Sequence, residues 1–128
     1  MLSLETYKKV LSELLDELPE EFFQKLNGGV VVSEELLIPD YARGNDICIM
    51  GQYQVRYGMR QIVMYKGSFD RSHPGADEAA AKAILRGILR HEFRHHLEYL
   101  GGIHGSSSLE AQDEREKRDY IARHRDMD

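Results

Sequence analysis

Hydrophobic residues recur every three or four positions near the start of the chain. This period predicts an amphipathic helix over residues 3–18, with Ser3 as its N-cap and one apolar face made of Leu4, Tyr7, Leu11, Leu14 and Leu18. Pro19 ends that helix, and residues 20–26 are expected to form a second, short one. A later stretch, from Ala76 or Asp77 to about Leu100, is rich in helix-forming Ala and Leu and ends at Gly101-Gly102. It predicts a long helix.

The middle of the chain has a different pattern, which is typical of strands. Short apolar and β-branched runs separated by turn residues predict three strands, at residues 30–32, 47–55 and 61–65. Residues 34–44 connect the first two strands, and residues 56–58 form a turn that makes an antiparallel pair around Gly58. Residues 68–75 are expected to be a loop.

A last helix is expected from about Ser107, because Ser107 and Glu110 have the spacing of a capping box. Its apolar residues Leu109, Tyr120 and Ile121 define a buried face. Taken together, these elements predict one domain over residues 1–128 with an α+β fold. A small mixed or antiparallel sheet would pack on the N-terminal helix and the long helix, with a C-terminal helix after them.

Composition narrows the function classes. The chain has 128 residues, of which 41% are hydrophobic and 30% charged, and a formal net charge of −5. That charge argues against non-specific nucleic-acid binding, which needs an excess of Lys and Arg. Cys48 is the single cysteine, so no internal disulfide forms, which fits a reducing compartment. No signal peptide or membrane-spanning run is visible, so we expect a cytoplasmic protein; the oligomeric state stays open.

The long helix carries the sequence His91-Glu92-Phe93-Arg94-His95, which is an H-E-x-x-H motif. Two histidines four positions apart lie on one helical face, so both imidazoles can reach one metal ion. Glu92 lies about 100° round the helix, beside the metal, where it can act on water that Zn²⁺ activates. The motif therefore predicts Zn²⁺ held by His91 and His95, with Glu92 as catalytic base. The alternative is a solvated, His-rich helix surface.

Two neighbours of the motif are assigned lesser roles. His96 points about 100° away from His95 and is expected to pack or to contact a ligand residue, not to bind metal. Glu98 lies on the ligand face but one turn too far along the helix axis. It is expected to make a supporting contact or to be a surface charge.

A catalytic zinc site usually has three protein ligands, so a third is expected downstream of the Gly101-Gly102 break. Asp113 ranks first, because it falls on the apolar face of the last helix, where a carboxylate is costly unless it is paired or bound to metal. Glu110 ranks second, because its position relative to the apolar face is intermediate and its role as a capping residue is a strong alternative to metal binding. His104 and Glu114 follow, and the choice stays open.

At these residues the sequence resembles a family of small bacterial zincin-like metallopeptidases of about this length, many from anaerobic Firmicutes. The resemblance rests on residues 91–98, on residues 50–53 together with 62–69, and on Leu109-Glu110 followed by Asp113. It implies a minimal zincin-like fold, metallopeptidase activity, and the usual roles for His91, Glu92 and His95. The chain departs from the family pattern between residues 102 and 109, where an expected acidic residue is missing.

The resemblance also bears on how a substrate would bind. In zincins an edge strand follows the cleft and pairs with an extended peptide, and residues 62–65 are one candidate for that strand. An ordinary core strand followed by a turn is the alternative. Tyr53, Tyr65, Tyr99 and Arg94 are possible donors to the oxyanion, and the sequence does not select one.

Two functions follow from these patterns. The first is a zinc-dependent hydrolase, most simply a metallopeptidase acting on a peptide or protein substrate. The second is a non-catalytic zinc-stabilised binding module or pseudo-peptidase. An intact Glu92 favours the enzyme, because a structural zinc site does not need that residue. Four protein ligands, for example His91, His95, His104 and Asp113, would favour the binding module.

Overall fold

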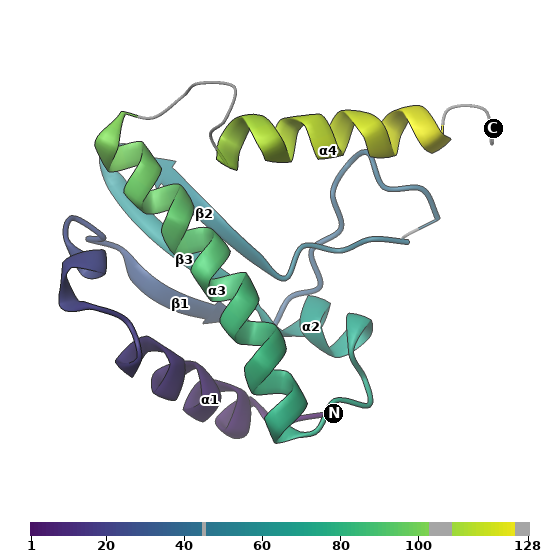
Figure 1. The fold of residues 1–128 in the computed structure, drawn as a ribbon. Helices are drawn as coiled ribbons and strands as arrows, with labels where there is room; N and C mark the ends of the chain where they lie inside the picture. The colour runs from purple at the N-terminus through teal and green to yellow at the C-terminus, as the bar shows by residue number, and fades with distance from the viewer. Residues whose placement is uncertain (45, 103–108, 125–128) are drawn as a thin grey trace.

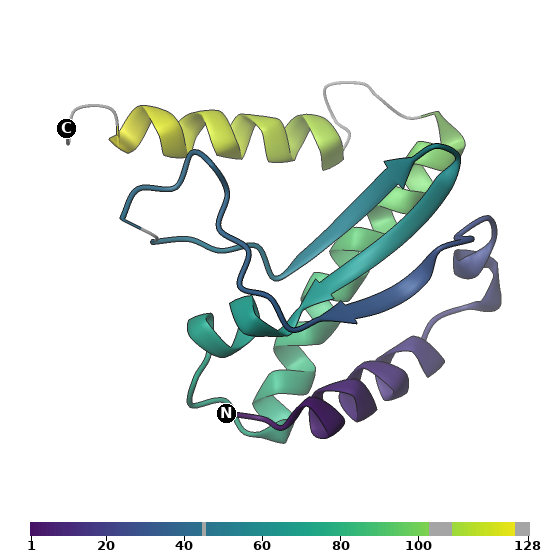
Figure 2. The same cartoon turned by 180° about the vertical axis from the view of Figure 1, so that it is seen from behind.

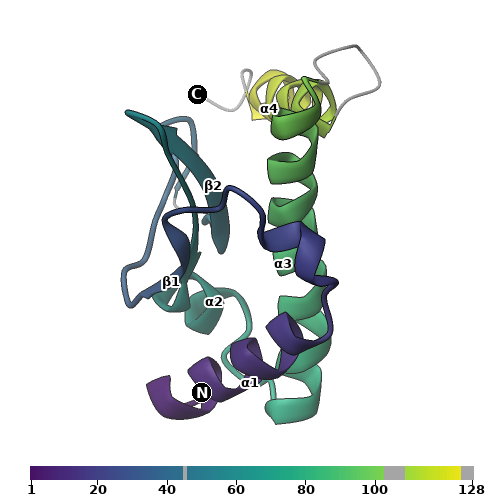
Figure 3. The ribbon, with the colours of Figure 1, turned by 90° about the vertical axis from the view of Figure 1, so that its left-hand side faces the viewer.

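The long helix over residues 78–101 runs along one face of a small sheet, and the N-terminal helix packs against that long helix, as the side view in Figure 3 shows. The computed structural model describes residues 1–44, 46–102 and 109–124. In chain order, its elements are α1 (Leu4–Asp16), the 3-10 helix η1 (Glu20–Phe23), β1 (Gly29–Ser33), β2 (Gly51–Arg56), β3 (Met59–Tyr65), α2 (Lys66–Ser72), α3 (Glu78–Gly101) and α4 (Leu109–His124) (Figure 1). The predicted α+β class is confirmed.

The sheet has three strands in the order β1-β3-β2. β1 runs parallel to β3, with Val31 opposite Val63, whereas β2 runs antiparallel to β3, with Tyr53 opposite Ile62. The antiparallel pair is joined by the predicted turn, in which Tyr57 and Gly58 both have positive φ values of 49° and 80°. A two-residue turn with this backbone matches the twist of the strands that it connects.

The sheet order decides between the two alternatives for residues 62–65, because it excludes an edge strand beside the cleft and bears out the core strand. These residues belong to β3, which is the central strand and pairs on both sides. Ile62 and Met64 are fully buried, as expected for a strand between two neighbours. β2 is instead the edge strand that contacts α3.

The hydrophobic core lies between this sheet and the helices α1 and α3. Ser3 caps α1 as predicted, since its hydroxyl accepts a hydrogen bond from the Thr6 N–H. The buried face of α1 includes the predicted Tyr7, Leu11 and Leu14. They meet a stripe of α3 side chains made of Ala81, Leu85, Leu89 and Phe93. Burial of these apolar side chains stabilises one position of α3 against the sheet, and it therefore also fixes where the H-E-x-x-H motif lies.

Other boundaries differ from the prediction. The 3-10 helix η1 is shorter than the expected 20–26, and the expected strand 47–55 begins only at Gly51, because Ile49 bridges Leu37 instead of β3.

The loop expected at 68–75 is wrong over residues 68–72, which belong to the helix α2. Within α2, Lys66 and Asp70 form a 2.6 Å ion pair between two nearly buried side chains. The proposed cap Ser107 lies outside the described residues.

α4 crosses the C-terminal half of α3, with Asp113 next to His91 and His95, and faces the long connection between β1 and β2. Figure 2 shows this connection, in blue, rising from the end of β1, beside the strands, to α4. The predicted apolar face of α4 is borne out, since Leu109 and Tyr120 are buried. No helix in the described part of the chain is long and apolar enough to cross a membrane.

Candidate metal centre

The two motif histidines are presented by α3, whose ends are both capped. The Asp77 side chain accepts a hydrogen bond from the Ala80 N–H at the start, and Gly102 ends the helix in the left-handed conformation. His91 and His95 stand one turn apart on the same face, and their ring centroids are 5.1 Å apart. The helix therefore presents two imidazoles side by side, as the spacing predicts.

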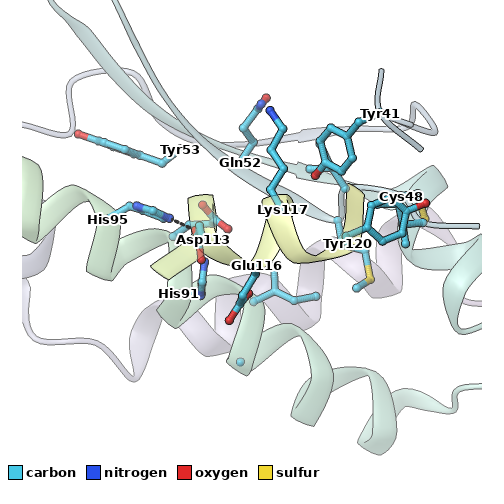
Figure 4. Close-up of a pocket in the computed structure, with 17 residues that line it drawn as sticks. Tyr41, Cys48, Gln52, Tyr53, His91, His95, Asp113, Glu116, Lys117 and Tyr120 are labelled. Atoms are coloured by element: carbon cyan, nitrogen blue, oxygen red, sulfur yellow. Dashed lines mark hydrogen bonds and ion pairs between the residues drawn. The ribbon is translucent and has the colours of Figure 1, made fainter. Parts of the chain in front are cut away.

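Asp113 of α4 completes a group of three possible metal ligands. Its Oδ2 lies 3.0 Å from Nε2 of His91 and 2.6 Å from Nε2 of His95 (Figure 4). One ligand atom from each of these residues lies within 4.8 Å of the other two. Ligand atoms around tetrahedral Zn²⁺ are separated by about 3–3.5 Å, given bond lengths of about 2.0–2.2 Å. This group could therefore hold a metal ion after small side-chain shifts.

The structure also distinguishes among the other residues considered as third ligand. Glu114 is exposed on α4 and does not belong to the group. His104 lies outside the described residues, as does the side chain of Glu110. Asp113, ranked first from the sequence, is the carboxylate that the structure places against both histidines.

Glu92 lies beside this group and is almost completely buried, with 7% of its surface exposed. The backbone N–H of Tyr53 in β2 lies close to its carboxylate and favours the charged form. Burial raises the pKa of Glu92 above its ordinary value, while His91, His95 and the Tyr53 N–H act in the opposite direction. A buried carboxylate with a raised pKa is a better proton acceptor than an ordinary surface carboxylate.

His96 does not belong to the group of His91, His95 and Asp113, which we call the metal group, and it contacts other residues instead. This agrees with the supporting role expected of it. The side chain is fully buried, and its Nε2 lies 2.8 Å from the Gln24 carbonyl oxygen. Nε2 must therefore donate, which leaves Nδ1 to accept a hydrogen bond from the Tyr53 hydroxyl at 2.6 Å. Burial lowers the pKa of His96 and raises that of Tyr53 to about 12, so both stay neutral. His96 thus fixes Tyr53, whose backbone N–H contacts Glu92.

Glu98 links the two helices that carry the ligands. One carboxylate oxygen accepts a hydrogen bond from the Leu109 N–H at the first residue of α4, at 2.8 Å, and the other accepts from Arg94. The hydrogen bond from Leu109, followed by that from Arg94, holds the pKa of Glu98 below its usual value. Sequence spacing placed Glu98 near the ligand face but could not show this contact, because nothing local indicates where α4 begins in space.

The metal group opens into a cleft of about 750 Å³. It lies between α3, α4, β2 and the segment before β2, as Figure 4 shows from the labelled side chains. Of the four possible oxyanion donors, only Tyr53 lines this cleft, and its hydroxyl proton is engaged by His96. The three possible ligands and residues 51–53 of β2 therefore line the same cleft.

Comparison with known proteins finds a similar solved structure. Protein-family models and curated protein sequences give no match. A solved structure described as a "conserved hypothetical protein" from "Thermo thermophilus" is similar over 78% of this chain and 98% of its own, with 30% identity and a TM-score of 0.65. That description states no activity. At this identity and coverage, the chain belongs to the same family as that conserved hypothetical protein.

Proposed function

We propose that the protein is a zinc-dependent hydrolase, most simply a metallopeptidase. In this proposal His91, His95 and Asp113 bind the metal and Glu92 is the general base. The observation that carries the proposal is the convergence of the three ligand atoms from two helices, with a buried carboxylate beside them that is not one of the three.

The number of ligands favours catalysis over a purely structural metal site. Three donors converge in the part of the chain that the structure describes. Structural zinc sites usually have four protein ligands, whereas catalytic sites have three and keep one position open. The three side chains are also accessible from the cleft, with 40% of His91, 34% of Asp113 and 21% of His95 exposed.

The expected chemistry divides between the metal and the protein. When bound, Zn²⁺ supplies Lewis acidity, which polarises a substrate carbonyl and acidifies water. Glu92 then accepts a proton from the attacking water and delivers it to the leaving amine nitrogen. The Tyr53 N–H lies close to the Glu92 carboxylate and favours its charged form.

An extended peptide fits the cleft because a strand edge borders it. β2 pairs with β3 on one side only, and its residues Gly51, Gln52 and Tyr53 line the cleft. A peptide in extended conformation can add to such an edge through backbone hydrogen bonds. A peptide or protein is therefore the substrate class that we propose.

Metal content is the first test. We expect about one Zn²⁺ per chain by elemental analysis, and strong loss of it in His91→Ala and His95→Ala. Two histidines and one carboxylate also suit Fe(II), so iron is measured in the same samples. Stoichiometric zinc in the protein with both substitutions would refute the metal site.

Hydrolysis is the second test. Glu92→Gln should retain zinc and fold but lose activity by at least ~10²–10⁴-fold on a peptide that the wild type cleaves, since the general base is gone. Glu114→Gln is the matched control, because that carboxylate is exposed and outside the cleft. Equal turnover by Glu92→Gln and wild type would show that Glu92 is not the base. Zinc binding without cleavage of any peptide would favour the binding module.

A further inference from the structure

The cleft extends well beyond the metal group, along α3 toward its N-terminal half. In Figure 4 Tyr53 and His95 lie at one end of the cleft, whereas Tyr41, Cys48 and Tyr120 lie at the other. The residues that line this second end come from the chain before β2, from the α3 turn before His91, and from α4. This second end of the cleft is therefore lined by residues other than the three possible metal ligands.

The second end is mainly apolar. It is lined by Ile47, Ile49 and Met50 from the chain before β2 and by Ile88 from α3. Among the residues that the structure describes, the charged side chains at this end come from α4: they are Glu116 and Lys117, which are exposed and have opposite signs. A half-enclosed apolar surface with balanced charge at its rim favours an uncharged, apolar group over a charged one.

Gly87 is an exposed glycine among the residues that line the cleft. It lies in the middle of α3, one turn before His91 and on the same helical face. Glycine destabilises a helix interior relative to alanine, and no packing contact requires it here, since a Cβ atom at Gly87 would meet nothing within 4 Å. The backbone has no positive φ at this position either. A larger side chain, however, would extend into the cleft that Gly87 lines.

The opposite wall is fixed by contacts between α4 and the chain before β2. The Tyr120 hydroxyl accepts a hydrogen bond from the Arg43 N–H at 3.0 Å and donates one to Asp46. The Tyr41 ring packs edge-on against Tyr120, and the Lys117 ammonium lies 4.8 Å from the Tyr41 centroid. These contacts hold the space open as a preformed site.

From these observations we propose that this end of the cleft is a substrate subsite, lined by Gly87, that takes a bulky apolar side chain of the peptide next to the bond that is cleaved. The proposal rests on the proposed function. A peptide side chain is the occupant that fits, because the cleft joins the metal ligands directly and is bordered by the edge of β2. A peptide lying along that edge, with its carbonyl at the metal group, would direct a neighbouring side chain into the space beside Gly87.

Variants at Gly87 test the subsite. Wild type, Gly87→Ala, Gly87→Leu and the control Ala83→Leu are incubated with a library of synthetic peptides, and the products are sequenced by mass spectrometry. We expect the wild type to prefer Leu, Met or Phe at one position flanking the cleaved bond. Gly87→Leu should lower cleavage of those peptides ~10- to 100-fold while cleaving peptides with a small residue there, and Gly87→Ala should lie between. Ala83 is exposed on α3 outside the cleft, so Ala83→Leu should keep the wild-type profile.

A binding experiment separates this inference from the proposed function. Zinc-loaded Glu92→Gln protein, with and without Gly87→Leu, is titrated with fluorescently labelled peptides that contain either Leu or Gly at the preferred position. If no library peptide is cleaved, labelled peptides with Leu or Gly at each position in turn are used. Selective binding of Leu peptides that Gly87→Leu abolishes supports the subsite, even if no cleavage is found. Any of three results would overturn the subsite: cleavage by the wild type without a side-chain preference, an unchanged cleavage profile in Gly87→Leu, or no selective binding of Leu peptides by the Glu92→Gln protein. Thermal unfolding of every variant checks that the fold is intact.

Discussion

Gly51 allows β2 and α3 to approach closely next to Glu92, and replacing it by alanine should be costly. A Cβ atom at this position would lie 2.7 Å from Cγ2 of Ile88, 3.2 Å from Sδ of Met64 and 3.4 Å from Cγ of Glu92. Carbon atoms prefer about 3.5–4.0 Å, so the Ile88 contact is too short by roughly 1 Å. Met64 can adapt because its side chain is flexible, whereas the β-branched Ile88 is stiff at χ1. Overpacking of this kind costs about 1–3 kcal/mol.

The contact partner can be identified by a double-mutant cycle in urea unfolding. Gly51→Ala alone should lower the free energy of unfolding by about 1–3 kcal/mol, or Tm by roughly 3–5 °C per kcal/mol. Ile88→Ala removes Cγ2, so the double variant should be more stable than the sum of the single effects by about 1–2 kcal/mol. Leu15→Ala on α1 serves as the control partner and should be additive with Gly51→Ala. Additivity of Gly51→Ala with Ile88→Ala as well would refute the reasoning.

Three further predictions concern the residues around the metal group. Asp113→Asn should lower zinc affinity by at least tenfold in chelator competition while far-UV circular dichroism is unchanged, because a charged ligand becomes neutral; equal affinity would exclude Asp113 as a ligand. Glu98→Ala should weaken zinc binding ~10–100-fold although Glu98 is not a ligand, since α4 loses the hydrogen bond from the Leu109 N–H to the Glu98 carboxylate. Because the pKa of Glu98 is lowered, the stabilisation from this hydrogen bond should be fully present above the ordinary carboxyl pKa and should fade as pH falls through the lowered value. Tyr53→Phe should lower the free energy of unfolding by about 1–3 kcal/mol, because Nδ1 of the buried His96 loses its partner, and a wild-type urea midpoint would contradict that hydrogen bond.

The elements that the sequence predicted well are those set by local periodicity and capping. α1, its Ser3 cap, the turn at Tyr57-Gly58 and the extent of α3 all follow from neighbouring residues. The placement of His91 and His95 on one face follows from the same helical period. Asp113 was ranked first by a burial argument, since a carboxylate on an apolar face needs a partner.

The features that the sequence missed depend on contacts between distant segments. α2 is stabilised where Gly67 approaches the backbone of Glu34 and Glu35 and where the Ser68 hydroxyl accepts a hydrogen bond from the Leu37 N–H. The parallel pairing of β1 with β3 makes β3 central, and no local pattern distinguishes a central strand from an edge strand of similar composition. For the same reason, the hydrogen bonds from His96 to Gln24 and Tyr53 could not be predicted.

The metal group draws its members from two helices, and Asp113 follows His95 by 18 residues. During synthesis the ribosome therefore releases both histidines before it releases the carboxylate. α3 can form as soon as its own residues emerge and would then offer a metal ion only two imidazoles. If the protein binds metal as proposed, the third ligand joins only when α4 docks on α3, so a chain in which α4 has not docked should bind metal weakly and exchange it freely.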